Sequence, residues 1–87
     1  MSDAIKITVK YFASIREAIG KSSEAIELEA NTVMALRDVL IAKGSPYAEA
    51  LARGKSVRTA FNQVMCDESM LLTDGSEVAF FPPVTGG

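Results

Sequence analysis

The residues of this sequence that could do chemistry are the last two, Gly86 and Gly87, and what they offer is a carboxylate. A carboxylate is ionised at neutral pH and is a poor electrophile until it is activated, for instance as an acyl-adenylate. Because glycine has no side chain, such an end can enter a narrow channel. The activated acyl group could then accept an amine, as in protein tagging, or a sulfur atom. From the two glycines alone, an ordinary frayed end is the commoner explanation.

Nothing else in the sequence forms a recognisable catalytic centre. The sequence contains no histidine, no glycine-rich phosphate loop and no cluster of cysteines, which removes the usual general base, nucleotide site and metal site. Asp67 and Glu68 are adjacent, and adjacent strand residues face opposite ways, so they are a poor carboxylate pair. We therefore expect no bound cofactor and an activating partner that consumes ATP. A stand-alone enzyme is the least favoured hypothesis.

Composition sets the class of protein. The 87 residues, 48% of them hydrophobic, suffice for one globular domain. The formal net charge of −2 argues against a nucleic-acid partner. The single cysteine, Cys66, allows no disulfide within the chain, which is typical of a reducing compartment. There is no signal peptide and no apolar run long enough to span a membrane, so we expect a cytoplasmic protein without a membrane partner.

The first part of the sequence predicts a strand, a short helix and a second strand. Apolar and polar residues alternate over residues 5–11, which is the pattern of a strand with one buried face. Ser14 and Glu17 have the spacing of a capping box and predict a helix over residues 14–19. Alternation returns over residues 24–28 and predicts the second strand.

Residues 33–43 predict the main helix. Asn31 or Thr32 could cap its start, and Gly44 is expected to end it. The helix should turn one apolar stripe toward the core. The residues of that stripe are Val33, Leu36, Val39 and Leu40.

The last part of the sequence predicts a second short helix and three strands. Ser45 and Pro46 resemble an N-cap followed by proline at the first helical position, which predicts a helix or turn over residues 47–53. Turns are expected at Asn62-Gln63 and at Asp74-Gly75. The predicted strands cover residues 58–62, 64–66 and 77–81, and Pro82 and Pro83 must end the last one.

This order of elements predicts an α+β fold in which a mixed sheet curls around one main helix. A ferredoxin-like split arrangement is the alternative, because pattern alone does not separate the two. We expect one domain over residues 1–83, followed by a flexible tail over residues 84–87. The prolines should stiffen the exit of that tail and direct it away from the body.

Three segments resemble the small, sulfur-carrying subunits of molybdopterin synthases. Residues 74–87, with their Phe-Phe-Pro-Pro-Val-Thr-Gly-Gly end, carry the most specific similarity. Residues 10–17 are similar to the first strand and helix start of that family, and residues 60–63 to its central strand and turn. The resemblance implies a ubiquitin-like β-grasp fold.

The resemblance also implies an activity. An adenylyltransferase of the ubiquitin-activating type would adenylate Gly87 with ATP, and a sulfur donor protein would supply the sulfur of a thiocarboxylate. The tail would insert into a large subunit and donate that sulfur to cyclic pyranopterin monophosphate, forming the molybdopterin dithiolene. Two large and two small subunits would form a heterotetramer.

The same family places an apolar patch against the large subunit, at positions that correspond to Phe12, Met65 and Phe81. From spacing alone, all three would be assigned to the core. The resemblance favours the interface for Met65 and Phe81, followed by the residues of the exit and tail. These are Pro82, Pro83, Val84, Thr85, Gly86 and Gly87.

Two other functions remain open. The chain could carry sulfur in another pathway, such as that of thiamine, or act as a ubiquitin-related modifier. It could also be a ubiquitin-like interaction module without chemistry at its end. Cys66 could relay sulfur, although a half-buried strand residue is the simpler interpretation. Most basic side chains should form a solvated face, with one or two touching a partner; they are Arg16, Arg53, Lys55 and Arg58.

Overall fold

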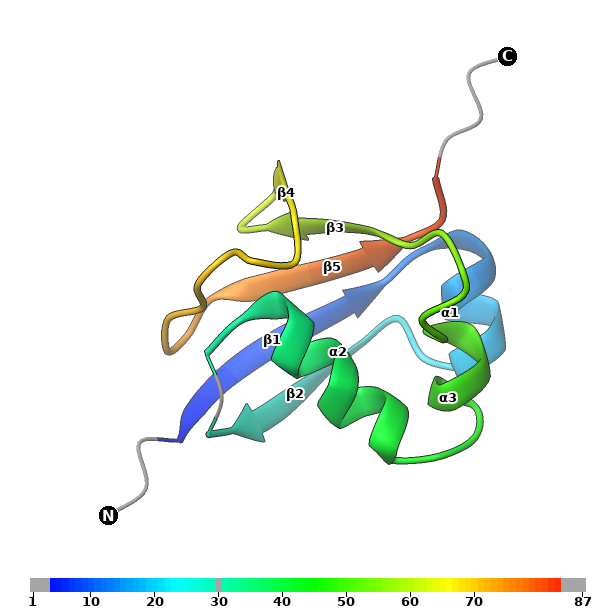
Figure 1. The fold of residues 1–87 in the computed structure, drawn as a ribbon, viewed down its shortest axis with the longest axis horizontal. Helices are drawn as coiled ribbons and strands as arrows, with labels where there is room; N and C mark the ends of the chain where they lie inside the picture. Colours follow the sequence, from blue (N-terminus) through cyan, green and yellow to red (C-terminus); the bar gives the residue numbers. More distant parts are fainter. Residues whose placement is uncertain (1–3, 30, 84–87) are drawn as a thin grey trace.

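Five strands form one mixed sheet in the order β2-β1-β5-β3-β4 (Figure 1). The computed structural model describes residues 4–29 and 31–83. Within them, no helix is long and apolar enough to cross a membrane. The elements are β1 (Ile5–Tyr11), α1 (Ala13–Ile19), β2 (Ser23–Leu28), α2 (Val33–Ala42), α3 (Tyr47–Ala50), β3 (Arg58–Phe61), β4 (Val64–Cys66) and β5 (Glu77–Phe81).

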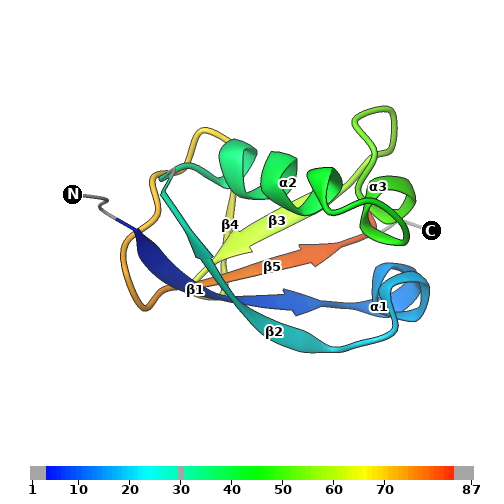
Figure 2. The same ribbon diagram turned by 90° about the horizontal axis from the view of Figure 1, so that it is seen from below.

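The last strand lies at the centre of the sheet. β5 pairs in parallel with β1 on one side and antiparallel with β3 on the other. β2 and β4 extend the sheet as antiparallel neighbours of β1 and β3. α2 lies across one face, while α1 and α3 lie near the end where β1 and β5 finish (Figure 2). This arrangement is the predicted mixed sheet around one helix, and the ferredoxin-like alternative is wrong.

The core lies between α2 and the sheet face that it covers. The inward residues of the two central strands are fully buried, as their alternation predicted, and they meet the buried stripe of α2. Burying each large aliphatic side chain stabilises the fold by about 1.5–3 kcal/mol. The residues with no exposed surface include Ile7, Val9, Val33, Leu36, Leu40, Val78 and Phe80.

The predicted capping box of the first helix is wrong. α1 begins at Ala13, and Phe12 occupies the N-cap position without a side-chain hydrogen bond. The cause is the sheet: the Phe12 amide donates to the Phe80 carbonyl at 3.1 Å, so Phe12 still continues the β1–β5 ladder. Ser14 then lies inside the first turn. The end of the helix is as predicted, with Gly20 in the left-handed region at φ 90°.

Thr32 caps the main helix as predicted, since its hydroxyl accepts a hydrogen bond from the Ala35 amide at 3.1 Å. One member of the predicted stripe is misplaced, because Val39 is exposed. Its place on the buried face is taken by a charged residue, Arg37. Positions 33, 36, 37 and 40 have the spacing of one helical face, so the backbone geometry brings Arg37 inside.

The second short helix is shorter than predicted and starts differently. It covers Tyr47–Ala50, and Pro46 rather than Ser45 is its N-cap residue. The Ser45 hydroxyl hydrogen-bonds the Glu49 carboxylate instead of a backbone amide. A side-chain acceptor one turn ahead therefore competes with the predicted capping role.

The β3–β4 hairpin confirms the predicted turn. Asn62 and Gln63 have φ values of 48° and 71°, as a two-residue hairpin turn of the primed type requires. Asn62 also fastens the turn to β5. Its amide donates to the Glu77 carbonyl at 2.8 Å, and its side-chain oxygen accepts from the Glu77 amide at 2.9 Å.

Candidate functional site

Pro82 and Pro83 lead from β5 toward the C-terminus, and we call this segment the exit. It starts where two parallel strands end together. β1 ends at Tyr11 and β5 at Phe81, and parallel pairing brings these ends to one edge of the sheet. Pro82 and Pro83 follow Phe81 and are half-buried, and they form no strand. Proline has no amide hydrogen for a ladder, which explains why the strand ends there.

Phe12 and Phe81 form an aromatic pair beside this exit. Their ring centroids lie 6.5 Å apart and their planes meet at 85°, an edge-to-face contact. Phe12 is 44% exposed, and Phe81 is half-buried. The spacing argument that assigned both rings to the core is therefore wrong, because β1 and β5 turn these two residues away from α2.

Met65 lies on the same side of the sheet as Phe81. Ala60 of β3 pairs with Met65 of β4 on one side and with Ala79 of β5 on the other, so these three side chains share a face. Phe81 shares it too, because it lies two residues beyond Ala79. Met65 is 58% exposed. We call this side, which carries Phe12, Phe81, Met65, Ala60 and Ala79, the open face.

Charged residues border the open face. Arg58 pairs directly with Phe81 across the β3–β5 ladder and is exposed. At the other side, the Lys10 ammonium lies 3.6 Å from the Glu77 carboxylate. The open face thus has an apolar middle and a polar rim, the composition of many protein–protein interfaces.

The remaining candidates of the tail are Val84, Thr85, Gly86 and Gly87, and all four lie outside the described residues. Cys66 is half-buried, as its simpler interpretation required, and its sulfur lies 3.6 Å from the Thr59 hydroxyl. Among residues 4–29 and 31–83, no group of three or more potential ligands could hold a metal ion.

Asp67 and Glu68 lie after the end of β4, so the sequence argument that treated them as strand residues is wrong. The hydroxyl and amide of Ser69 donate to Asp67 and lower its pKa. Glu68 instead joins two arginines. Burial raises the pKa of Glu68, but hydrogen bonds from Arg53 and Arg37 outweigh burial and bring the pKa below its ordinary value.

Arg37 is the residue that the sequence patterns missed. Its side chain is almost fully buried, and it donates to the carbonyls of Leu51 at 2.8 Å, Ala52 at 2.7 Å and Lys55 at 3.3 Å. It also forms an ion pair with Glu68 at 2.5 Å. Its helical spacing with Leu36 and Leu40 is the signal that could have found it. Arg37 therefore fixes the loop that follows α3.

Arg53 is exposed, like Arg16, Lys55 and Arg58, so the four basic side chains lie at the surface as expected. The Arg53 guanidinium lies 2.6 Å from the Asp38 carboxylate and also pairs with Glu68. The side chain is 43% exposed, so each contact is a modest contribution. Together with Arg37, these contacts join α2, the loop after α3 and the loop after β4.

The strand order, the helix across one face and the open face beside the exit define a ubiquitin-like β-grasp protein. The model of the ThiS family matches residues 9–87. The molybdopterin synthase sulfur carrier subunit of Escherichia coli is 44% identical over 81 residues, which cover 93% of this chain and 99% of that protein. This chain belongs to the ThiS family.

Two solved structures have the same fold. A candidate subunit 1 of molybdopterin converting factor from Pyrococcus furiosus superposes with a TM-score of 0.75 at 28% identity, covering 92% of this chain and 99% of its own. Another is a complex of subunits 1 and 2 of molybdopterin-converting factor from Helicobacter pylori. It matches with a TM-score of 0.62 at 28% identity, covering 95% of this chain and 100% of the matched chain.

Proposed function

We propose that this chain is the sulfur carrier subunit of a molybdopterin synthase and that the carboxylate of Gly87 carries the sulfur. The observation that carries the proposal is the 44% identity to the Escherichia coli sulfur carrier subunit, over 99% of that protein. The Gly86-Gly87 end supports it, because a carboxylate without side chains beside it suits transfer chemistry in a narrow channel.

The chemistry proceeds in three steps on the Gly87 carboxylate. A carboxylate oxygen attacks the α-phosphorus of ATP in an adenylyltransferase, and pyrophosphate leaves. The outer sulfur of a persulfide on a donor protein then displaces AMP, so that one carboxylate oxygen leaves with the phosphate. A thiol cleaves the S–S bond of the resulting acyl disulfide, which leaves the thiocarboxylate on Gly87 and a disulfide on the donor. The adenylate is needed because a free carboxylate is a poor electrophile. The resulting thiocarboxylate supplies sulfur for the dithiolene made from cyclic pyranopterin monophosphate.

The body of the chain would position this group. Pro82 and Pro83 give a stiff exit, and the residues from Val84 to Gly86 form a spacer between that exit and Gly87. The open face would bind the large subunit through Phe12, Phe81 and Met65. Exposed aromatic and methionine side chains with small residues between them favour such a role.

The decisive experiment is the intact mass of the chain after incubation with an adenylyltransferase, ATP and a sulfur donor protein. We expect a gain equal to the exchange of one oxygen for sulfur, located at Gly87 by fragmentation. A chain with one alanine appended after Gly87 is the matched control and should gain nothing, because its last carboxylate no longer fits a channel shaped for glycine.

A second experiment identifies the pathway in which the chain delivers its sulfur. The sulfurated chain, mixed with the large subunit and cyclic pyranopterin monophosphate, should produce molybdopterin, whereas a chain lacking Gly87 should not. Molybdopterin formation by the shortened chain would overturn the proposal. A mass gain without any molybdopterin would assign the chain to another sulfur pathway, and no mass gain with competent enzymes would favour the interaction module.

A further inference from the structure

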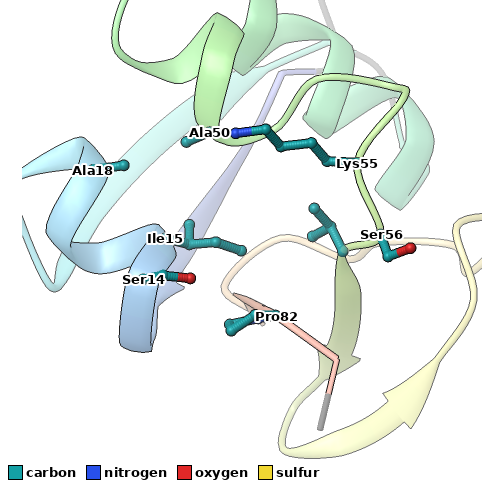
Figure 3. A pocket seen from close by; sticks show the side chains of 8 residues that line it. Ser14, Ile15, Ala18, Ala50, Lys55, Ser56 and Pro82 are labelled. Carbon is teal, nitrogen blue, oxygen red and sulfur yellow. The ribbon is translucent and has the colours of Figure 1, made fainter. Parts of the chain in front are cut away.

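A cavity of about 140 Å³ lies at the base of the exit, next to the open face (Figure 3). Phe81 of the open face is followed directly by Pro82, which forms one wall. Two deeply buried residues, Ile15 and Ala50, line it, each with only 5% of its surface exposed. The full set of lining residues is Ser14, Ile15, Ala18, Ala50, Lys55, Ser56, Val57 and Pro82.

The cavity combines this apolar lining with one positive charge. In Figure 3 the Lys55 side chain extends across the cavity toward Ala50. Among residues 4–29 and 31–83, no carboxylate lies within 4.0 Å of the Lys55 ammonium. Ser14 and Ser56 also line the cavity, and Lys55 is the cation that a carboxylate placed there would meet.

The backbone of Lys55 is held from inside the protein. The buried guanidinium of Arg37 accounts for this, because it donates to the carbonyls of Leu51, Ala52 and Lys55 itself. The cavity wall is therefore part of the same hydrogen-bonded structure as α2.

We propose that this cavity receives an aspartate or glutamate side chain of the large subunit, whose methylene carbons pack against Ile15 and Ala50 while its carboxylate pairs with Lys55. The inference rests on the proposed function, because it names a contact within that complex. Continuity with the open face favours it, because Pro82, which lines the cavity, directly follows Phe81 of the open face.

A free anion fits this cavity less well than a protein side chain. Phosphate or sulfate needs several donors around it, whereas the walls here are mostly aliphatic and supply a single cation. A carboxylate on a short aliphatic stem satisfies both parts of the cavity. The charge pair also confers specificity, because an acidic partner residue is rejected once Lys55 loses its charge.

The first test is the affinity of the full-length chain for the purified large subunit, by titration calorimetry. Lys55→Glu should weaken binding by about tenfold or more, because like charges then face each other at the interface. Lys43→Glu is the matched control, since Lys43 is also exposed and does not line the cavity. It should stay within about twofold of the unaltered chain.

The second test fills the cavity without changing charge. Ala18→Phe places a ring over the apolar wall and should also weaken binding by about tenfold, since the partner side chain can no longer enter. Ala18 is exposed on α1, so the variant should fold, and its thermal unfolding midpoint serves as a check.

The third test locates the contact. A carbodiimide, which joins an ammonium to a carboxylate only at contact distance, should link Lys55 to an aspartate or glutamate of the large subunit, as read by peptide mass mapping. Unchanged affinity of Lys55→Glu and Ala18→Phe, in a complex where the unaltered chain binds and delivers sulfur, would overturn this inference and leave the proposed function standing. A sulfurated chain that binds no large subunit would overturn both.

Discussion

Two aromatic pairs lie one residue apart at the end of the β1–β5 ladder and have opposite surroundings. Tyr11 and Phe80 lie on the helix side, with ring centroids 6.4 Å apart and planes at 17°. Phe12 and Phe81 lie on the open face, with centroids 6.5 Å apart. The first pair is almost fully buried, whereas Phe12 of the second is 44% exposed.

The difference shows how one strand, β5, can contribute to the core with one face and to an exposed surface with the other. Because side chains alternate along β5, Phe80 of the inner pair (Tyr11 and Phe80) contributes to the core, whereas Phe81 of the outer pair (Phe12 and Phe81) contributes to a surface. The inner pair also has a polar anchor, since the hydroxyls of Tyr11 and Tyr47 both donate to Glu24 at 2.7 Å. No such anchor holds the rings of the outer pair among the described residues.

The largest expected effect comes from the inner pair. Phe80→Ala should lower the free energy of unfolding by about 3–5 kcal/mol, because it leaves a cavity between Tyr11 and α2. Urea titration followed by circular dichroism measures this. A loss below about 1 kcal/mol would show that the core can collapse around the gap and would break the comparison.

The outer pair should show the reverse behaviour. Phe81→Ala should cost only about 1 kcal/mol of stability, the order of one aromatic contact, yet weaken binding to the large subunit by about 2 kcal/mol as an interface anchor. Urea titration and calorimetry on the same preparation give both values. Phe81→Leu, which keeps apolar volume, is the matched control and should recover part of the affinity.

The anchor of the inner pair makes stability depend on pH. Burial raises the pKa of Glu24, but hydrogen bonds from Tyr47, Tyr11 and Lys21 outweigh burial and lower it. A carboxyl with a lowered pKa in the folded state contributes stability above its unfolded value, near 4.5, and that contribution is lost as pH falls below it. Glu24→Gln should therefore flatten the decline of unfolding free energy between about pH 5 and pH 3.

At alkaline pH, the dependence of folding stability on pH has the opposite sign. Burial, followed by the hydrogen bond to Glu24, raises the pKa of Tyr11 far above its ordinary 10.0. The folded state therefore keeps its proton where the unfolded state loses it, and stability should fall as pH rises above about 10. Tyr11→Phe should lessen that fall in a urea titration series. An unchanged alkaline slope would argue against a raised pKa of Tyr11 in the folded state.

The smallest effect tests the hairpin that carries Met65, away from both pairs. Gln63 has a φ of 71°, a region that glycine adopts without steric cost. Gln63→Gly should raise the unfolding free energy by about 0.5–1 kcal/mol and leave binding unchanged. Asn62→Gly serves as a contrast, because it also removes the side-chain acceptor of the Glu77 amide. Weaker binding by Gln63→Gly would mean that the turn itself contacts the partner.

The sequence predicted the elements where a pattern had one physical cause. Alternation in residues 5–11 and 77–81 follows from burial of one strand face, and the turn at Asn62 follows from two residues that tolerate positive φ. The capping box at Ser14 failed because the Phe12 amide donates a hydrogen bond to the Phe80 carbonyl of distant β5, which keeps Phe12 extended. The spacing of neighbouring residues cannot predict a hydrogen-bond partner that is distant in the sequence.

The sequence predicted only those parts of the candidate site whose residue types are informative without knowledge of the fold. The terminal glycines and the two prolines were visible in the sequence, but the exposure of Phe12 was not, because an alternating pattern leaves open which face is covered. Arg37 was missed because a charge is normally assigned to solvent. The cavity beside Pro82 joins α1, α3, the loop at residues 55–57 and the exit, segments that only the fold brings together.

The central place of β5 also has a mechanical meaning. A partner that takes hold of the chain beyond Pro83 pulls on a strand that is hydrogen-bonded along both edges, to β1 and to β3. A load along the strand is therefore shared by both ladders at once, whereas an edge strand could peel away one bond at a time. Under the proposed function, the body of the protein would withstand traction while a partner enzyme binds and releases the C-terminal residues.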